Sequence, residues 1–539
     1  MPVPVFLALK NRFLSMPASI YKKLGIAAVI MMASVFLSRL LGLFRLMTVA
    51  YIGGRGADVD AYQVAFVVPE ILNHVAASGF LSITFIPIFS RYLSQKREAQ
   101  GWLVFSIIFS CFGSLLLILI IVAHILAPEL VAVLARGRSN PEFRESVVHM
   151  TRIILPAQFF FFTGGLFMAV QFAQEKFLIP AMAPLIYNLG IIAGGFLLGP
   201  RIGMEGFSWG VLAGAFVGNF VLQWWGASRV RMKFSVKFDF KHPDLKRYVK
   251  LTLPLMLGMT MFFSMELFKI FFGSYLPAGS IADLEYSMRT MLLLAAFFGQ
   301  AVGVASYPFM ARLVAEEKMQ QLNDLLNNTL RYLSLVIPIS VLFMVLRKEV
   351  ILILFQRGKF DAAATEQTAT VLIFMLVGSF AFAANTIVPR AYYATQDTLF
   401  PAVYGTMAVL VSIPLYWLGL NLMGTLGVAL AASLSAIMQV LVLYGLWNRR
   451  HPNPGSRSVY RLYLKMIAFS VPFGLFLTWF KSAVLFRIDA SAFAGSLVVC
   501  VVCGAVSVLI LLAAGHGLGI NEISELSHRL RKKLRPARQ

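Results

Sequence analysis

Long apolar runs alternate with short polar segments along the whole chain. Because about 20 helical residues cross a bilayer core of about 30 Å, runs of this length predict transmembrane helices. The runs are continuous, without the alternating pattern of outer-membrane barrel strands, so the predicted fold is an all-α polytopic membrane protein. About fourteen spans are predicted, at approximately 25–51, 60–92, 101–127, 148–173, 178–199, 205–228, 249–276, 284–311, 328–346, 366–393, 398–419, 424–447, 460–481 and 491–516.

The composition supports this class of protein. Of 539 residues, 59% are hydrophobic and only 13% are charged, whereas about a quarter of the residues in soluble proteins are charged. The mean hydropathy is +0.78. Residues 1–24 carry basic residues without a short apolar core and cleavage site, so we expect the first span to be retained. The three cysteines, Cys111, Cys500 and Cys503, fall in apolar spans, and we interpret them as packing residues.

The net charge of +23 reflects basic residues that gather in alternate loops. They are dense at the N-terminus, in 91–97, in 229–247, in 449–465 and in the C-terminal tail. With fourteen spans these segments share one side, and the positive-inside rule then places both termini in the cytoplasm. The basic segments 136–144 and 347–359 are exceptions that would lie outside. Charges that flank membrane spans favour an anionic lipid surface over nucleic acid.

The chain contains an internal repeat at a fixed offset of 221 residues. Pro87 and Arg91 match Pro308 and Arg312, and the landmarks "FAQEKFLIPA" (172–181) and "GMEG" (203–206) match "YATQDTLFPA" (393–402) and "GTLG" (424–427). Spans one to six therefore correspond to spans seven to twelve, and the last two are an addition. An even number of crossings separates equivalent spans, so the predicted lobes are parallel, as in transporters that alternate access around a central cavity.

Several ionisable residues lie within predicted spans, where a charge costs about 2.5–3.5 kcal/mol unless it faces a cavity or a partner. Arg39 lies about 21 Å into the first span, by the rise of about 1.5 Å per residue. Candidate cavity residues are Arg39, Arg45, Asp60, Asn73, His74, Glu266, Lys269 and Arg289.

Each candidate also has a structural interpretation. Arg45 can extend to lipid headgroups, and Asp60 can cap the second helix. Glu266 and Lys269 are three residues apart and can form an ion pair within one helix. His74 can be a satisfied interior residue, and the prolines can simply kink helices.

Other chemistries lack their motifs. The sequence shows no phosphate-binding loop and no metal-ligand spacing, so we expect neither ATP hydrolysis nor a metal, and the protein is predicted not to be an enzyme. A membrane glycosyltransferase or ligase would need acidic residues, which are scarce here. A drug or cation antiporter would prefer an acidic cavity. Arginines instead suit an anionic cargo, because guanidinium pairs bidentately with phosphate.

Five segments together resemble the MurJ/MviN family of the multidrug/oligosaccharidyl-lipid/polysaccharide exporter superfamily. They are "SRLLGLFR" (38–45), "DAYQVAF" (60–66), "FIPIFSRYL" (85–93), "LFQRGKFD" (354–361) and "YYATQDTLFPA" (392–402). The resemblance spans roughly residues 25 to 515. It implies two six-helix lobes around a cationic cavity and a groove for a lipid tail formed by the last two helices. It also implies flipping of the undecaprenyl-pyrophosphate-linked peptidoglycan precursor, lipid II, driven by membrane potential or by a Na+ or H+ gradient.

Position by position, the resemblance implies substrate-binding roles for Arg39, Arg45, Asp60 and Arg289. It suggests Glu266 as a ligand for the coupling ion. Asn73 and His74 stand where well-known members carry a basic pair, and Ser78 and Met288 stand at acidic positions. The cavity is therefore expected to be less charged, which leaves the cargo open between lipid II and another undecaprenyl-linked saccharide of the exopolysaccharide or O-antigen type.

The sequence thus predicts a lipid II flippase of the bacterial inner membrane, without a cofactor, that contacts membrane lipids and the cell-wall synthesis machinery. The predicted organisation is a cytoplasmic segment (1–24), an N-lobe (25–228), a basic linker (229–248), a C-lobe (249–449), helices thirteen and fourteen (450–518) and a basic tail (519–539).

Overall fold

The computed structural model describes residues 18–74, 80–484, 486 and 488–517. The described residues are helical, with short turns and no strand, which confirms the all-α prediction. Ser78 lies outside the described residues. The chain divides into two compact units. The first unit is Met1–Val49, Ala65–Leu130 and Ser146–Met256, and the second is Ala50–Val64, Val131–Glu145 and Leu257–Gln539.

Two long helices, α2 (Ala18–Gly53) and α13 (Pro243–Gly273), run from one unit into the other. The other helices that lie mainly in the first unit are α4 (Val67–Leu72), α5 (Phe80–Ser94), α6 (Glu98–Ile125), α8 (Pro141–Ile154), α9 (Ala157–Ala173), α10 (Leu178–Ile202), α11 (Glu205–Ala215), the π-helix η2 (Phe216–Val221) and α12 (Leu222–Arg229).

The second unit holds most of the C-terminal half. Its helices are α3 (Ala57–Ala65), α7 (Ala127–Leu134), α14 (Ser280–Ala315), α15 (Met319–Leu333), α16 (Val336–Val345), α17 (Arg347–Phe355), α18 (Ala362–Leu376), α19 (Ser379–Ala384), α20 (Val388–Ala394), α21 (Leu399–Val411), α22 (Ile413–Met423), α23 (Thr425–Arg450), α24 (Ser456–Val484) and α25 (Phe493–Gly517).

Among the described residues, ten helices or continuous helix pairs are long and apolar enough to cross a membrane. An eleventh is the pair Ala362–Leu376 and Ser379–Ala394, which is bent by 58°. The predicted second span, 60–92, is divided into α3, α4 and α5. Helices α13 and α14 are 31 and 36 residues long but carry charged side chains near the middle of the unit. The protein is a multi-pass membrane protein, and the count of fourteen spans stays a prediction.

The backbone confirms the internal repeat, because conformations recur at the same offset of 221 residues. Positive φ angles occur at Lys96 (56°) and Glu317 (58°), and again at Glu175 (58°) and Gln396 (63°). Helix boundaries follow the same offset: α10 begins at Leu178 and α21 at Leu399, and α5 ends at Ser94 and α14 at Ala315. The two halves of the chain therefore build the same succession of helices.

Glycines allow close helix contact at equivalent places in both repeats. In the first unit, a Cβ added to Gly194 of α10 would lie 2.5 Å from the Gly210 Cα of α11. In the second unit, a Cβ on Gly427 of α23 would lie 1.9 Å from the Gly419 carbonyl oxygen of α22. Each helix pair follows the repeated Gly-x-x-Gly landmark, so the sequence repeat is also a packing repeat.

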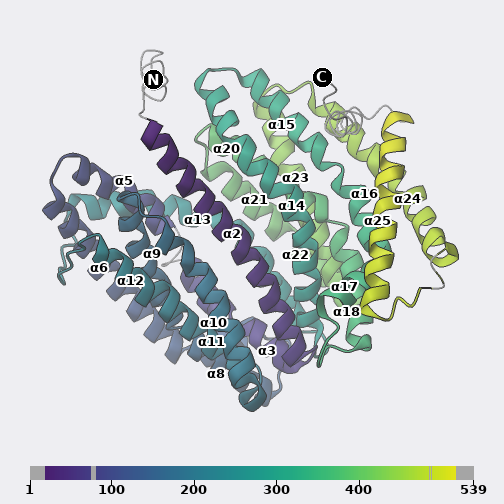
Figure 1. The fold of residues 1–539 in the computed structure, drawn as a ribbon, viewed down its shortest axis with the longest axis horizontal. Coiled ribbons are helices and arrows are strands. Elements are labelled where there is room, and N and C mark those ends of the chain that lie inside the picture. The colour runs from purple at the N-terminus through teal and green to yellow at the C-terminus, as the bar shows by residue number, and fades with distance from the viewer. Residues whose placement is uncertain (1–17, 75–79, 485, 487, 518–539) are drawn as a thin grey trace. The chain divides into compact units, whose positions relative to one another are not determined.

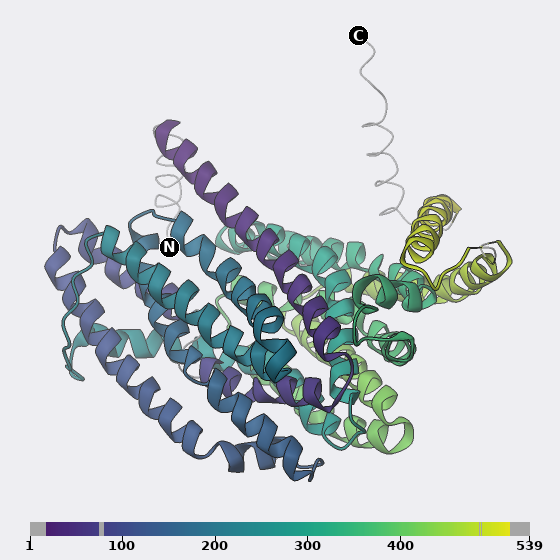
Figure 2. The same cartoon turned by 60° about the horizontal axis from the view of Figure 1, so that its bottom comes forward.

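The C-terminal helices pack on one edge of the C-terminal repeat within the second unit. Helix α24 contacts α16, and α25 contacts α17. In both views these helices, drawn at the yellow end of the colour scale, lie beside α16 and α17 (Figure 1 and Figure 2). Their outward-facing side chains are apolar; Leu464 and Leu475 are 67% and 68% exposed, as lipid-facing residues are in a membrane.

Candidate functional site

Asp60 is the centre of a buried polar cluster in the second unit. Its side chain is fully buried, and one carboxylate oxygen accepts hydrogen bonds from the Arg138 guanidinium at 2.8 Å and the Gly279 amide at 2.7 Å. The other oxygen accepts from the Ala282 amide at 2.8 Å. Both amides belong to the start of α14, where unpaired N–H groups and the helix dipole favour an anion. Asp60 therefore caps α14, a helix from the other repeat, instead of its own helix α3.

A second ion pair ties the same segments together. The Arg55 Nε atom lies 2.6 Å from an Asp283 carboxylate oxygen, and Thr368 donates a hydrogen bond to the other oxygen at 2.7 Å. The Tyr286 hydroxyl donates to the Gly54 carbonyl at 2.9 Å. We call Arg55, Asp60, Arg138 and Asp283 the latch. By sequence, residues 50–64 and 131–145 belong to the first repeat, but the latch packs them against the start of α14 in the second unit.

Four charged side chains meet between α13 and α14, also within the second unit. Lys269 Nζ lies 2.6 Å from Glu266 Oε1 and forms a further close ion pair with Glu285. Arg289 Nε lies 2.6 Å from Glu285 Oε1. The side chains of Lys269 and Glu285 are only 2% and 5% exposed. We call these residues the four-charge cluster; its formal charges balance, which offsets the cost of burying them.

The cluster presents Arg289 outward. The Arg289 side chain is 45% exposed, while Glu285 beneath it is buried. Glu266 is 21% exposed and sits 3.9 Å from the Arg289 guanidinium as well as beside Lys269. The ion pair expected within one helix between Glu266 and Lys269 is present. A coupling cation at Glu266 would have to compete with both basic groups.

The predicted residues of spans one and two lie in the first unit. Arg39 is exposed and Arg45 is half-buried on α2. Arg45 and Glu70 both lie close enough to Tyr187 of α10 to interact with it electrostatically. The His74 ring accepts from or donates to the surroundings near the end of α4, where its Nδ1 lies 2.8 Å from the Glu70 carbonyl oxygen. The adjacent Asn73 ends α4. Arg45 and Glu266 occupy equivalent positions of the two repeats with opposite charges.

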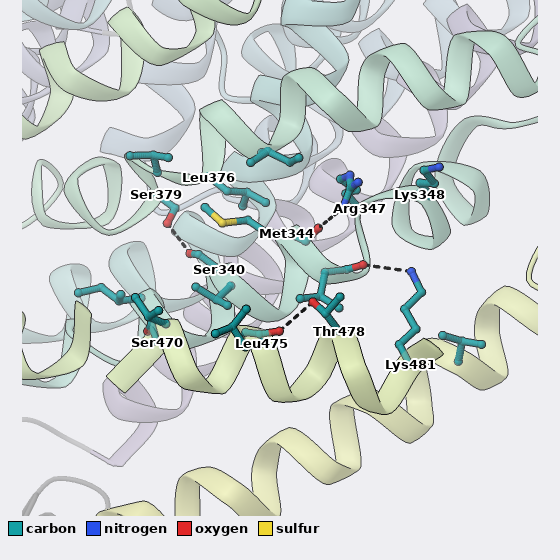
Figure 3. Close-up of a pocket in the computed structure, with 18 of the residues that line it drawn as sticks. Ser340, Met344, Arg347, Lys348, Leu376, Ser379, Ser470, Leu475, Thr478 and Lys481 are labelled. Carbon is teal, nitrogen blue, oxygen red and sulfur yellow. Dashed lines mark hydrogen bonds between the residues drawn. The ribbon is translucent and has the colours of Figure 1, made fainter. Parts of the chain in front are cut away.

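An apolar groove of about 1080 Å³ lies among α16, α18 and α24 of the second unit. Aliphatic residues such as Val341, Leu376 and Leu475 line its length. Three basic side chains, Arg347, Lys348 and Lys481, gather at one end, and Ser379 and Ser470 lie toward the other (Figure 3). The helix α24 forms one wall, as the resemblance implied for a lipid-tail groove.

Sequence reasoning missed three members of these clusters. Glu285 stands four residues before Arg289 in the same predicted span, a spacing that places both side chains on one helix face. Arg138 belongs to the basic segment 136–144, which was an exception to the charge asymmetry. Its charge is balanced by Asp60. Asp283 carried no signal of its own, because its partner Arg55 is 228 residues away.

Comparison with known proteins gives consistent results. The family described as "Lipid II flippase MurJ" matches residues 49–516. A probable lipid II flippase MurJ of Bdellovibrio bacteriovorus is 26% identical over 457 residues, covering 83% of this chain and 86% of the relative. The lipid II flippase MurJ of Burkholderia cenocepacia is 25% identical over 430 residues, covering 78% and 83% of the two chains.

Solved structures share the fold. A lipid II flippase MurJ in an inward closed conformation superposes with a TM-score of 0.72 at 24% identity, covering 89% of this chain and 98% of that one. An inward-facing multidrug resistance MATE family transporter of the MOP superfamily gives a TM-score of 0.62 at 14% identity, covering 80% and 98%.

The repeated helical fold, with charged clusters on its long helices, defines a polytopic membrane protein of the class that includes the MOP superfamily transporters. Within that class the family match covers most of the chain. The chain belongs to the MurJ family of lipid II flippases. The matched residues begin after Arg39 and Arg45, so the roles of those two arginines stay predictions.

Proposed function

We propose that this protein is a flippase that moves the lipid-linked peptidoglycan precursor, lipid II, from the inner to the outer leaflet of the bacterial cytoplasmic membrane by alternating access. The observation that carries the proposal is the family match over residues 49–516. The relatives that bear the same name are matched over more than three quarters of this chain, for example 83% and 78%. The mechanism is transport, and no covalent chemistry is proposed.

Arginines are proposed to engage the anionic headgroup. Guanidinium groups pair with phosphate through two parallel hydrogen bonds. Arg289 is exposed and is held from beneath by Glu285, so its head is positioned by the helix that carries it. Arg39 and Arg45 are proposed to act on the same pyrophosphate and first sugar. For Asp60 the buried surroundings support a structural role in the latch over direct contact with cargo.

The proposed topology places both termini in the cytoplasm. The alternation of basic loops supports this orientation. The two exceptional segments are partly neutralised by acidic partners, since Arg138 pairs with Asp60 and Lys348 with Glu366. Membrane potential, worth about 2.3 kcal/mol per charge per 100 mV, is the proposed drive for the return of the cationic empty protein. A Na+ or H+ gradient acting through Glu266 is the alternative drive.

Rescue of a bacterium depleted of its own lipid II flippase tests the proposal. We expect growth from wild-type protein and loss of growth from Arg289→Ala at equal membrane abundance. Arg312→Ala is the matched control, because Arg312 lies on the same helix and its ion pair with Glu316 is at an exposed position. Failure of the wild type to rescue would refute the assignment to lipid II. Full rescue by Arg289→Ala would refute the headgroup role of Arg289.

A second cargo is favoured by one observation. Asn73 and His74 replace a basic pair expected from the resemblance, which lowers the charge available to a headgroup. A flippase for another undecaprenyl-linked saccharide would fail the rescue above. It would instead restore surface polysaccharide in a strain that lacks the corresponding flippase.

A further inference from the structure

The apolar groove occupies only one half of α24. Its lining residues on this helix run from Ile467 to Ser482, whereas the helix runs from Ser456 to Val484. The interval from Ile467 to Lys481 corresponds to about 21 Å of helix at about 1.5 Å per residue. Under the proposed topology α24 begins at the cytoplasmic face. The groove therefore lies in the half of the membrane nearer the outer face, with its basic end outermost.

The basic end carries one cation without a carboxylate partner. Lys481 lies 2.7 Å from the buried Glu349, and Lys348 lies 2.6 Å from Glu366. Arg347 forms no ion pair within the described part of the chain. Its NH1 group donates to the Met344 carbonyl at 3.2 Å, while its buried Nε has no hydrogen-bond partner. Figure 3 shows Arg347 at this end of the groove, beside the apolar wall.

These features call for an anion attached to an apolar chain. A buried guanidinium N–H without an acceptor is costly, and natural structures nearly always provide a partner for such a group. The groove itself is an apolar channel that suits a hydrocarbon chain, and its volume of about 1080 Å³ is that of a substantial ligand site. Phosphate is the anion that an arginine fork binds best.

We propose that the groove is a product-side site: the polyprenyl chain of the translocated cargo lies in it, and Arg347 binds the pyrophosphate at the outer face. This inference rests on the proposed function and adds a stage to it. Arg289 acts on the headgroup during translocation, and Arg347 holds the same headgroup class afterwards, before release into the outer leaflet. A single end cation above one channel fits a linear chain with a terminal phosphate better than a two-chain phospholipid.

Binding to purified full-length protein in detergent tests the proposal. Farnesyl pyrophosphate is the probe, and farnesol, inorganic pyrophosphate and short-chain phosphatidylglycerol are the comparison ligands. We expect farnesyl pyrophosphate to bind at least tenfold more tightly than each of the other three. Arg347→Gln should reduce its affinity about tenfold, which corresponds to about 1.4 kcal/mol. It should leave the affinity for farnesol unchanged. Arg347→Lys should retain part of the affinity, because it keeps the charge.

Matched variants separate the groove from general effects. Lys348→Gln is the charge control, because the exposed Lys348 already pairs with Glu366. We expect it to change affinity less than twofold. Val471→Trp should fill the groove and weaken both farnesyl pyrophosphate and farnesol, since Val471 lines it and is 62% exposed. Leu464→Trp lies on the same helix outside the lining and should change neither affinity. Unchanged melting temperatures would confirm that the variants fold.

The outcomes are distinct. Equal affinity for farnesyl pyrophosphate and farnesol, or no effect of Arg347→Gln, would overturn the role of Arg347. Tighter binding of phosphatidylglycerol, lost in Arg347→Gln, would overturn the cargo assignment and make the groove a phospholipid site. Failure of the wild type in the rescue assay refutes lipid II as cargo, whereas binding that depends on Arg347 is measured without any transport. The two hypotheses can therefore fail separately.

Discussion

The role of Asp60 can be decided by a double-mutant cycle with Arg138. In Asp60→Asn the carboxylate charge is lost while the side-chain shape is kept. The Arg138 side chain, which is 11% exposed, is then left without its carboxylate partner. Breaking a buried ion pair by removing one partner costs about 3–5 kcal/mol. Part of this loss comes from the α14 amides, since Asn offers one acceptor oxygen where Asp offers two.

The double variant Asp60→Asn/Arg138→Met removes both charges. Replacing a buried pair with groups of similar size is often close to neutral. One weakened hydrogen bond at α14 should remain, at about 1 kcal/mol. We therefore expect the double variant to lie about 1–2 kcal/mol below the wild type, although Asp60→Asn alone lies about 3–5 kcal/mol below it.

Chemical denaturation in mixed micelles measures the free energies of unfolding, and the rescue assay measures function. Asp58→Asn is the control, because Asp58 lies in the same first turn of α3 but is exposed. If the latch role is correct, the double variant regains both stability and rescue. A double variant that is stable but fails to rescue would show that Asp60 acts on cargo. Additive losses in the cycle would refute the ion-pair reasoning itself.

Three further predictions concern packing and charge. Lys269→Met should lower stability by about 3–5 kcal/mol, because it removes a cation from the buried Glu285, and adding Glu285→Gln should restore most of it; melting curves that show no coupling would contradict this. Gly427→Ala should cost about 1–3 kcal/mol by forcing α22 and α23 apart, whereas Gly445→Ala, whose Cβ meets nothing within 4 Å, should be neutral or stabilising in the same melting assay. Cys111 is a buried free thiol, so a water-soluble maleimide should label it only after denaturation, and rapid labelling of native protein would count against its packing role.

Much of the fold was predictable because its information is local or periodic. Apolar runs long enough to cross a bilayer predicted helices throughout, and the described residues are helical. The offset of 221 residues predicted the repeat, and the positive φ angles of Lys96 and Glu317 confirm it at a resolution of single residues. Breaks within spans were harder to predict. The divided second span and the 58° bend after α18 arise from packing and prolines that hydropathy does not register.

The charged clusters show how far the candidate site could be predicted. Glu266 and Lys269 were open between an ion pair and an ion ligand, and spacing alone could not choose between them. The structure adds Glu285 from the next helix and completes a balanced group of four. For Asp60 the expected helix cap was the right kind of interaction on the wrong helix. Its amide partners, Gly279 and Ala282, lie about 220 residues away along the chain.

The sequence by itself determined the class of the protein: helices that span a membrane, a duplicated set of them, and arginines suited to an anionic cargo. These properties follow from solvation and periodicity, which act on each segment separately. Tertiary structure alone decided which charges neutralise one another. Whether Arg138, Glu285 or Arg347 finds a partner depends on helices brought together by packing, and the energy of a buried charge is set by those neighbours. The unpaired Arg347 at the end of an apolar groove is the part of that result that no segment of sequence encodes alone.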